Sequence, residues 1–491
     1  MFDRSLKGLR QWVAALLFAL GFAGEAGAAL PSVRNVPGQP NLMLGAYDLA
    51  SLGFSRDEYF LSGTATSYKL TGLQNIDGNW NAVPAGTAPY ATRIVVVRPT
   101  DPKKFNGTVL VEWMNVTAGA DASPDWNATH RELLRGGYAW VGVSAQKVGV
   151  EGGPNLMGLG VPLKKADPQR YGQLSHPGDP YSFDIYSQVA ALLKAPRASG
   201  LLGALAPKRI ISAGESQSAV YLTTYVNAVD PVAKVYDGFL IHSRFGAAAL
   251  LDADSMMTAR SGAARLRTKL RVPVITVETE TDLVDGNLLG FHLARQPDND
   301  RLRVWEVTGT AHADNYTFSI GSTDLPSTPL EKIAAGYRPT ADVLGGKLAK
   351  PMNFAPQHHY VVQAALWHLD RWIRTGKAPP KAEPIRLTGS PVTFVTDDHG
   401  IALGGVRTPW VDVPTARLSG VGNSGAQLAF LVGVGEPFDQ ARLDRLYPDG
   451  KKEYLKAFEA SLDVTIAKGF ILPADRQEII ALAPLMYQGS R

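Results

Sequence analysis

The residues best suited to chemistry are grouped around Ser216, where an apolar stretch ends in a run of small residues. The stretch reads Arg209-Ile210-Ile211-Ser212-Ala213-Gly214-Glu215-Ser216-Gln217-Ser218, and a helix-like segment follows over residues 219–229. A strand that passes directly into a helix holds the corner residue in a strained conformation and exposes its side chain at the sheet edge. Taken alone, the pattern also fits a helix N-cap. In its context, Gly-x-Ser-x-Ser predicts a nucleophile elbow with Ser216 as the nucleophile.

Two later segments bring an acid and a histidine, in the order serine, acid, histidine along the chain. Residues 272–282 read as a β-branched strand that ends in the acids Glu278, Glu280 and Asp282. Residues 302–312 read as a second strand, followed by a glycine-containing loop that ends in His312. This chain order is one of the known orders of a catalytic triad. We therefore expect the three side chains to meet at one edge of a sheet.

The three residue types complement one another chemically. A serine hydroxyl is a poor nucleophile at neutral pH and needs a base whose pKa lies near the working pH, which favours histidine. A carboxylate fixes the tautomer of that histidine and stabilises the imidazolium that forms. We predict His312 as the general base and Asp282 as the acid, because Asp282 lies in the loop beyond the strand. Glu280 and Glu278 are the alternatives for the acid.

A tetrahedral intermediate also needs N–H donors for its oxyanion. The backbone N–H of Gln217 is the first candidate, because it begins the helix after Ser216. The second donor should come from the loop after the strand at 108–114, where Asn115 and Val116 are the candidates. Asn115 fits equally well as a side chain that orders this loop. The chain lacks a His-Gly-Gly-Gly run, so its sequence leaves the choice of donor open.

A few further residues are candidates for substrate contact. His242 and Arg244 follow the strand after the elbow, and Trp113 closes an earlier strand, so each could line the pocket. Sheet capping and core packing are the alternative interpretations of these residues. His358-His359 and Asp397-Asp398-His399 lack the spacing of metal ligands. We therefore expect no metal and no cofactor.

The elements that must position these residues alternate between strand and helix after Thr108. We expect strands at 108–114, 138–144 and 237–242, an elbow strand from Arg209 to the Gly-x-Ser-x-Ser motif, a strand from Val272 that ends before Asp282, and a strand from Leu302 to the loop of His312. We expect helices at 126–135, 182–194, 219–229, 288–295 and 357–374, and a helical tail over 439–482. This alternation predicts an α/β fold, with a mostly parallel sheet covered by helices on both faces.

The 491 residues, of which 45% are hydrophobic, suffice for one large core with additions. We place a β-rich N-terminal part at 29–100, the catalytic core at 101–380, and an extension at 381–491 that is first β and then helical. Long excursions between sheet elements tend to lie over the site and shape it. We therefore expect cap segments at 149–180, 245–270 and 313–356.

The first 28 residues have the pattern of a signal peptide. Basic residues precede an apolar stretch from Trp12 to Ala23, and Ala26-Gly27-Ala28 forms a small-residue cleavage site. We predict export to the periplasm or the medium. The chain has no cysteine, which excludes disulfides, a lipoprotein anchor and a thiol nucleophile.

The charge and hydropathy of the remaining chain exclude two classes of partner. A net charge of +4 gives no reason to expect nucleic acid. No later stretch reaches the roughly 20 apolar residues of a membrane span. We therefore expect no integral membrane association.

Several phrases together resemble one known family, the bacterial α/β-hydrolase-domain proteins. They are Phe105-Asn106-Gly107-Thr108-Val109, Val111-Glu112-Trp113-Met114-Asn115-Val116, Gly214-Glu215-Ser216-Gln217-Ser218-Ala219, Tyr236-Asp237-Gly238-Phe239, Glu280-Thr281-Asp282, Gly309-Thr310-Ala311-His312 and Leu403-Gly404-Gly405-Val406-Arg407-Thr408-Pro409-Trp410. The resemblance covers most of the chain after the leader. It implies the α/β-hydrolase fold, with nucleophile, acid and base at Ser216, Asp282 and His312. Ser218 replaces the usual last glycine of the elbow, which a small side chain should tolerate.

These observations lead us to expect an exported serine hydrolase that cleaves small or polymeric carboxylic esters through an acyl-enzyme. An acyltransferase or a lactonase would use the same triad and differ only in the acceptor. Outside the enzymes, the alternative is a catalytically silent binding protein on a hydrolase scaffold. The size of the acyl and alcohol groups and the oligomeric state do not follow from the sequence.

Overall fold

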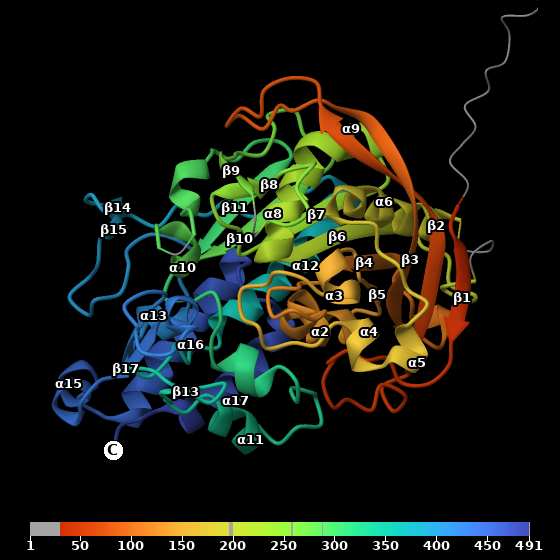
Figure 1. Cartoon of the computed structure of the whole chain (residues 1–491). Helices are drawn as coiled ribbons and strands as arrows, with labels where there is room; N and C mark the ends of the chain where they lie inside the picture. The colour runs from red at the N-terminus through yellow and green to blue at the C-terminus, as the bar shows by residue number, and fades with distance from the viewer. Residues whose placement is uncertain (1–29, 196–199, 257–258, 287, 491) are drawn as a thin grey trace, which may run out of the picture.

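The structure is a computed structural model that describes residues 30–195, 200–256, 259–286 and 288–490. The predicted signal peptide, residues 1–28, lies outside the described residues. Within them one large sheet (Figure 1) has the strand order β1 (Ser32–Val36), β2 (Phe54–Leu70), β3 (Ala82–Pro99), β5 (Ala139–Val143), β4 (Thr108–Trp113), β6 (Arg209–Glu215), β7 (Gly238–His242), β10 (Val274–Thr279) and β11 (Leu302–Val307).

The sheet is antiparallel at one side and parallel over the rest. Strands β1, β2 and β3 form a meander, and β3 pairs antiparallel with β5. From β5 to β11 all neighbouring strands pair parallel. These parallel strands are almost entirely buried, which explains why their sequences are nearly continuous β-branched and apolar runs. The mixed but mostly parallel sheet confirms the predicted fold class.

Helices cover both faces of the parallel strands. The main covering helices are α2 (Pro124–Arg135), α6 (Ser182–Lys194), α8 (Gln217–Thr224) and α12 (Gln357–Thr375). α6 and α8 share an apolar cluster with Val274 of β10, whereas α2 and α12 share another cluster with the adjacent Ile275. The two clusters lie on opposite faces because successive residues of a strand point to opposite sides. After α8 the chain continues through a π-helical turn, η3 (Tyr225–Val229), into α9 (Asp230–Ala233).

The predicted helix at 288–295 is wrong. In its place the structure has a single 3-10 turn, η4 (Phe291–Ala294). Gly290 donates its N–H to the side chain of Asp285, and Pro297 follows closely on the other side, so few residues remain for a regular helix. Phe291 and Ala294 are buried, and their spacing in the sequence imitates that of a helix.

Short elements occupy the connections between the sheet strands and the segment between β11 and α12. They are η1 (Pro102–Lys104), α3 (Lys147–Glu151), α4 (Leu163–Ala166), α5 (Pro168–Tyr171), η2 (Asp179–Tyr181), the pair β8 (Ala247–Ala249) and β9 (Arg260–Ala263), α10 (Glu280–Leu283), the π-helical turn η5 (Tyr316–Ile320), α11 (Leu330–Gly336), β12 (Asp342–Val343) and β13 (Gly346–Lys347). Most of them lie within the three predicted cap segments. None of the described helices is long and apolar enough to cross a membrane.

The C-terminal residues form a group of their own, coloured blue at the lower left of Figure 1. Their elements are β14 (Leu387–Thr388), β15 (Thr393–Phe394), α13 (Pro409–Asp412), β16 (Ala416–Ser419), α14 (Ala429–Val432), β17 (Val434–Pro437), α15 (Gln440–Leu446), α16 (Lys451–Lys468), η6 (Pro473–Asp475) and α17 (Arg476–Met486). An apolar cluster with Trp410, Phe458 and Ile479 holds α13, β16, α15, α16 and α17 together. This group reaches the loop of His312, because Ser419 and Gly420 donate hydrogen bonds to Glu280.

Candidate active site

Ser216 occupies the sharp corner between β6 and α8. Its backbone has φ 57° and ψ −117°, a conformation that is strained for a residue with a side chain. Gly214 permits this corner, since a Cβ atom at that position would lie 2.9 Å from Leu222 and 3.1 Å from Ser218. The N–H of Ser216 donates to the carbonyl oxygen of His242 at 2.9 Å, which fixes the corner to the end of β7. The sequence Gly-x-Ser-x-Ser therefore folds as an elbow.

Ser216, His312 and Asp282 form a continuous chain of hydrogen bonds. The Oγ atom of Ser216 lies 2.8 Å from Nε2 of His312, and Nδ1 of His312 lies 2.7 Å from Oδ1 of Asp282. Because an ionised carboxylate only accepts, Nδ1 carries the proton, and Nε2 is left to accept from the serine hydroxyl. His312 and Ser216 are 7% and 8% exposed, so the site is narrow but open to solvent.

The local structure holds the acid and the base in place. Oδ2 of Asp282 accepts from the N–H and the hydroxyl of Thr279, both at 2.7 Å, in a capping box at the start of α10. The N–H of His312 donates to the hydroxyl of Thr281 at 3.1 Å. Phe245 stacks on the imidazole with the ring centres 5.2 Å apart. Both side chains are thus fixed by contacts beyond the hydrogen bond that joins them.

Electrostatics favour the charged pair that forms during attack. Burial opposes the ionisation of Asp282, but its contacts with His312 and Thr279 hold the pKa of that carboxyl below its usual range. Burial likewise opposes a charge on His312, but Asp282 and Glu215 outweigh it and raise the pKa of the imidazole. A basic imidazole beside an ionised aspartate is suited to accept a proton from Ser216.

The alternative acids have other partners. The carboxylate of Glu280 accepts from the N–H of Gly309 at 2.7 Å, and from the N–H of Gly420 and the hydroxyl of Ser419 at 2.8 and 2.9 Å. It therefore ties the loop of His312 to the C-terminal group. Glu278 is fully buried, and neither of its carboxyl oxygens has a hydrogen-bond partner among the described residues. Of the three acids, the structure places Asp282 against the imidazole.

The candidate oxyanion donors differ in the acceptors to which their backbone N–H groups now donate. The backbone N–H of Asn115 donates to Ala122 at 2.9 Å, and its side-chain amide donates to Glu215, so this residue orders its loop. The N–H of Val116 donates to Oε1 of the Gln217 side chain at 3.1 Å. Gln217 begins α8, where the first N–H groups of a helix have no partner within it. The N–H of Val116 thus binds a carbonyl-type oxygen beside the elbow.

The structure places Trp113 and Arg244 in the interior. Trp113 is fully buried, stacks on Tyr221, and donates its Nε1–H to Gln146 at 3.1 Å. Arg244 is 1% exposed and donates to the carbonyl oxygens of Phe245 and Ala264. Its guanidinium lies over the ring of Phe291. These contacts match the alternative interpretation of both residues as packing and positioning groups.

His242 belongs to a buried polar group beneath the elbow. Its Nδ1 lies 2.9 Å from Asp125 of α2, and its Nε2 lies 2.8 Å from Nε2 of His358 of α12. Burial lowers the pKa of His242 to about 3 and raises that of Asp125 to about 8, so both groups are held neutral at pH 7. This group joins α2, β7 and α12 under Ser216. Sequence reasoning did not connect Asp125 with His358, because they are more than two hundred positions apart.

Glu215 is the other residue that sequence reasoning missed. Its Oε1 lies 3.2 Å from Nε2 of His312, the nitrogen that also contacts Ser216. The sequence did hold a signal that could have singled out Glu215, because it is the only charged residue between Arg209 and the end of α8.

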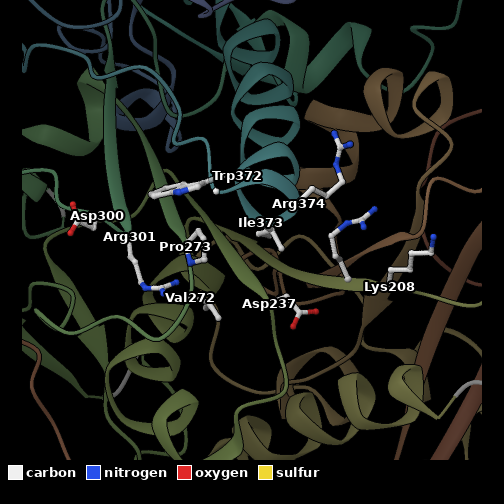
Figure 2. A pocket seen from close by; sticks show the side chains of 11 residues that line it. Lys208, Asp237, Val272, Pro273, Asp300, Arg301, Trp372, Ile373 and Arg374 are labelled. Carbon is white, nitrogen blue, oxygen red and sulfur yellow. The ribbon is translucent and has the colours of Figure 1, made fainter.

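A cavity lies at the other end of the sheet (Figure 2). Its volume is about 790 Å³, and its lining includes Arg209, Asp237, Pro273 and Arg301, at the amino ends of β6, β7, β10 and β11. Ser216, Asp282 and His312 follow the carboxyl ends of β6, β10 and β11. The cavity is therefore separate from the hydrogen-bonded chain, which lies where ligands bind in open parallel sheets.

Comparison with known proteins agrees with this architecture. A family model described as "Alpha/beta hydrolase domain" matches residues 26–481, so the chain belongs to the α/β-hydrolase domain family. This match confirms the resemblance and the fold predicted from the sequence. No curated protein matches the chain.

Solved structures with some likeness include a serine hydrolase without a lid from Xanthomonas campestris, which is 12% identical, with a TM-score of 0.27 over 50% of this chain and 86% of that one. A putative dienelactone hydrolase from Klebsiella pneumoniae is 12% identical, with a TM-score of 0.27 over 57% and 95% of the two chains. An esterase structure from Rhizomucor miehei is 12% identical, with a TM-score of 0.27 over 77% and 93%. At these values the fold assignment depends on the family match and on the sheet itself.

Proposed function

We propose that this protein is a serine hydrolase that cleaves carboxylic esters through an acyl-enzyme. The observation that carries the proposal is the hydrogen-bonded chain from Ser216 through His312 to Asp282, at the carboxyl edge of the parallel strands. A strained nucleophile, a base with a raised pKa and a buried, ionised acid are the parts that acyl transfer requires. Membership of the α/β-hydrolase domain family agrees with this chemistry.

In the first step, Oγ of Ser216 attacks the ester carbonyl while Nε2 of His312 takes the hydroxyl proton. Asp282 holds the imidazole in the required tautomer and stabilises its positive charge. When the tetrahedral intermediate collapses, the bond to the alcohol oxygen breaks and His312 returns the proton to the leaving alcohol. Water then attacks the acyl-Ser216 ester by the same route, which releases the acid and restores the hydroxyl.

The oxyanion would be held by the backbone N–H groups of Gln217 and Val116. Since the Gln217 side chain now accepts from Val116 at 3.1 Å, that side chain has to rotate away before a substrate oxygen can bind there. Its carbonyl oxygen thus imitates the oxyanion in the resting enzyme. Donors aimed at the developing charge supply a large part of the rate in such sites.

The proposed location is the periplasm or the medium, and it depends on the leader. The pattern of residues 1–28 supports export, with maturation near Ala29. Expression of the full chain in a Gram-negative host, followed by mass analysis of the purified protein, tests this. We expect a mature N-terminus near Ala29 in the periplasmic fraction, and an intact chain in the cytoplasm would contradict it.

A panel of fluorogenic and chromogenic esters, graded by acyl and alcohol size, tests the proposed function. The wild-type protein should release alcohol from at least one ester series, with an initial burst of one alcohol molecule per chain when deacylation is slow. Ser216→Ala should abolish this turnover and leave the thermal midpoint almost unchanged. Adding an alcohol acceptor separates hydrolysis from acyl transfer. Turnover that survives in Ser216→Ala would contradict the proposal.

A further inference from the structure

Glu215, the last residue of β6, places a second carboxyl group beside Nε2 of His312, the nitrogen that faces the hydroxyl of Ser216. Its Oε1 lies 3.2 Å from Nε2 of His312, while Oγ of Ser216 lies 2.8 Å from the same nitrogen. Asp282 contacts the other ring nitrogen, Nδ1, at 2.7 Å. The imidazole therefore lies between two carboxyl groups, one at each nitrogen.

A rigid loop holds Glu215 in this position. Nδ2 of Asn115 lies 3.3 Å from Oε2 and 3.2 Å from the backbone oxygen of Glu215, and donates toward both. Asn115 is itself fixed by two backbone hydrogen bonds with Ala122 and by the N–H of Thr117, which donates to its Oδ1. The side chain of Glu215 is 10% exposed. Its carboxyl group is thus oriented toward the imidazole and largely shielded from water.

The charged and titratable groups around Glu215 come from several elements. His312 follows β11, Asp282 lies in α10, and Asp125 lies in α2. Burial is the largest cause that raises the pKa of Glu215; the imidazole lowers this pKa, and the two acids raise it further. Behind the imidazole lie His242 of β7 and His358 of α12, both buried with lowered pKa values. Among the described residues, His312 is the only ion-pair partner of Glu215. No lysine or arginine of the described part of the chain therefore neutralises this carboxylate.

We propose that Glu215 is a further catalytic residue. Its carboxylate stabilises the positive charge that His312 gains when its Nε2 takes the proton of Ser216. The inference rests on the function proposed above. Before attack, the lone pair of Nε2 accepts from the serine hydroxyl. Once Nε2 is protonated, its N–H can point to both Oγ of Ser216 and Oε1 of Glu215. A carboxylate in contact with the imidazolium favours the charged state over the resting state.

The same contact makes Glu215 and His312 titrate as a pair. Burial raises the pKa of Glu215 to about 8, and the pKa of His312 is raised as well. While the pair holds one proton, either Glu215 donates it to Nε2 or Nε2 itself carries it. In both cases the lone pair of Nε2 is unavailable to Ser216. Activity therefore requires that the pair lose this proton. The acid limb of the pH profile should consequently lie at a higher pH than the acid limb of an enzyme with a lone histidine.

The test is the pH dependence of kcat/KM for the best ester, in wild type and in Glu215→Gln. With its carbonyl oxygen toward Asn115, the amide keeps the shape and that contact, carries no charge, and turns its NH₂ group toward Nε2 of His312. We expect the acid limb to move down by about one pH unit, because an opposite charge in contact shifts a pKa by at least that much. The plateau at high pH should fall by about tenfold or less, since the proton is only partly transferred in the transition state.

A residue that merely supports the fold would lower the plateau without moving the limb. Glu306→Gln is the matched control, because Glu306 is also a buried glutamate but pairs with Arg295. It should lower the thermal midpoint and leave the acid limb in place. If Glu215→Gln does not fold, Glu215→Ser removes the carboxyl group with a smaller side chain, and the same shift is expected. An acid limb that stays in place or moves up in the folded variant overturns the inference.

Failure of this inference and failure of the proposed function give different results. If Ser216→Ala is inactive but Glu215→Gln keeps the wild-type acid limb, only the proposed role of Glu215 is refuted. If Ser216→Ala retains ester turnover, the proposed triad is refuted, and the inference about Glu215 is refuted as well. A downward shift in Glu215→Gln, together with an inactive Ser216→Ala, supports both.

Discussion

Replacing Asp282 by asparagine should remove most of the activity and little of the stability. Oδ2 of Asp282 accepts from the backbone N–H of Thr279 at 2.7 Å, and Oδ1 accepts from Nδ1 of His312 at 2.7 Å. A backbone N–H can only donate, so the carbonyl oxygen of the new amide must face Thr279. Its NH₂ group then faces the imidazole. His312 is forced into the tautomer with a proton on Nε2, which cannot accept from Ser216.

The size of the effect follows from that tautomer change. An equivalent loss of tautomer control in a serine protease lowers kcat by about 10⁴-fold, which corresponds to about 5 kcal/mol of transition-state stabilisation. The opposite amide orientation would leave the N–H of Thr279 facing a donor, at a cost of about 1–3 kcal/mol. We therefore expect Asp282→Asn to lower kcat by 10³-fold to 10⁴-fold, while the thermal midpoint changes little.

Glu280→Gln is the matched comparison, because Glu280 lies two residues away and is equally buried. Its carboxylate accepts from Gly309, Gly420 and Ser419, so an amide there turns at least one bond into a clash of donors. This variant should lose about 1–3 kcal/mol of stability and keep most of its activity per folded molecule. Steady-state kinetics and scanning calorimetry on both variants decide whether Asp282 or Glu280 is the acid. Asp282→Asn with near-normal kcat and Glu280→Gln without activity would refute the reasoning and identify Glu280 as the acid.

Three further predictions follow from the same contacts. Because the pKa of His312 is raised and only the neutral imidazole is a base, kcat/KM should be full at high pH and should fall as the pH drops through a value above 6.5; an acid limb below 6 would contradict this. Gln217→Ala frees the N–H of Val116 and should raise kcat/KM for small esters by up to tenfold, about 1.4 kcal/mol, whereas a loss would show that the side chain assists turnover. Arg93→Met removes both buried ion pairs of this guanidinium, leaves Asp121 without an ion-pair partner among the described residues, and should cost about 3–5 kcal/mol in chemical denaturation; a cost under 1 kcal/mol would be inconsistent with the buried pairs.

Much of the framework could be predicted because each parallel strand is a continuous apolar run. The structure starts β4 at Thr108 and β11 at Leu302, as expected from the sequence, and places α6 at Ser182–Lys194. Ser216, Asp282 and His312 each come shortly after one of these strands. Parallel strands bring their carboxyl ends to the same edge, so three local patterns predicted a meeting of residues that are far apart in the chain.

The features that escaped prediction depend on contacts between elements. Nothing in the local sequence of Asn115 shows that its amide holds Glu215, one hundred positions later. The aromatic side chain of Trp113 fits a pocket wall and a core equally well until its neighbours are known. At 288–295, the apolar spacing of a helix arises from a single buried turn. In each case the decisive partner is distant in the sequence.

The most direct test of the central claim is reaction with a fluorophosphonate, a reagent that phosphonylates an activated serine and releases fluoride. We expect one adduct per chain, located by peptide mass spectrometry on Ser216, with a rate that falls at low pH as His312 becomes protonated. Ser216→Ala should not react, and His312→Ala should react at least 10³-fold more slowly. An unreactive, fully folded wild-type protein, or an adduct on a different serine, would contradict the account.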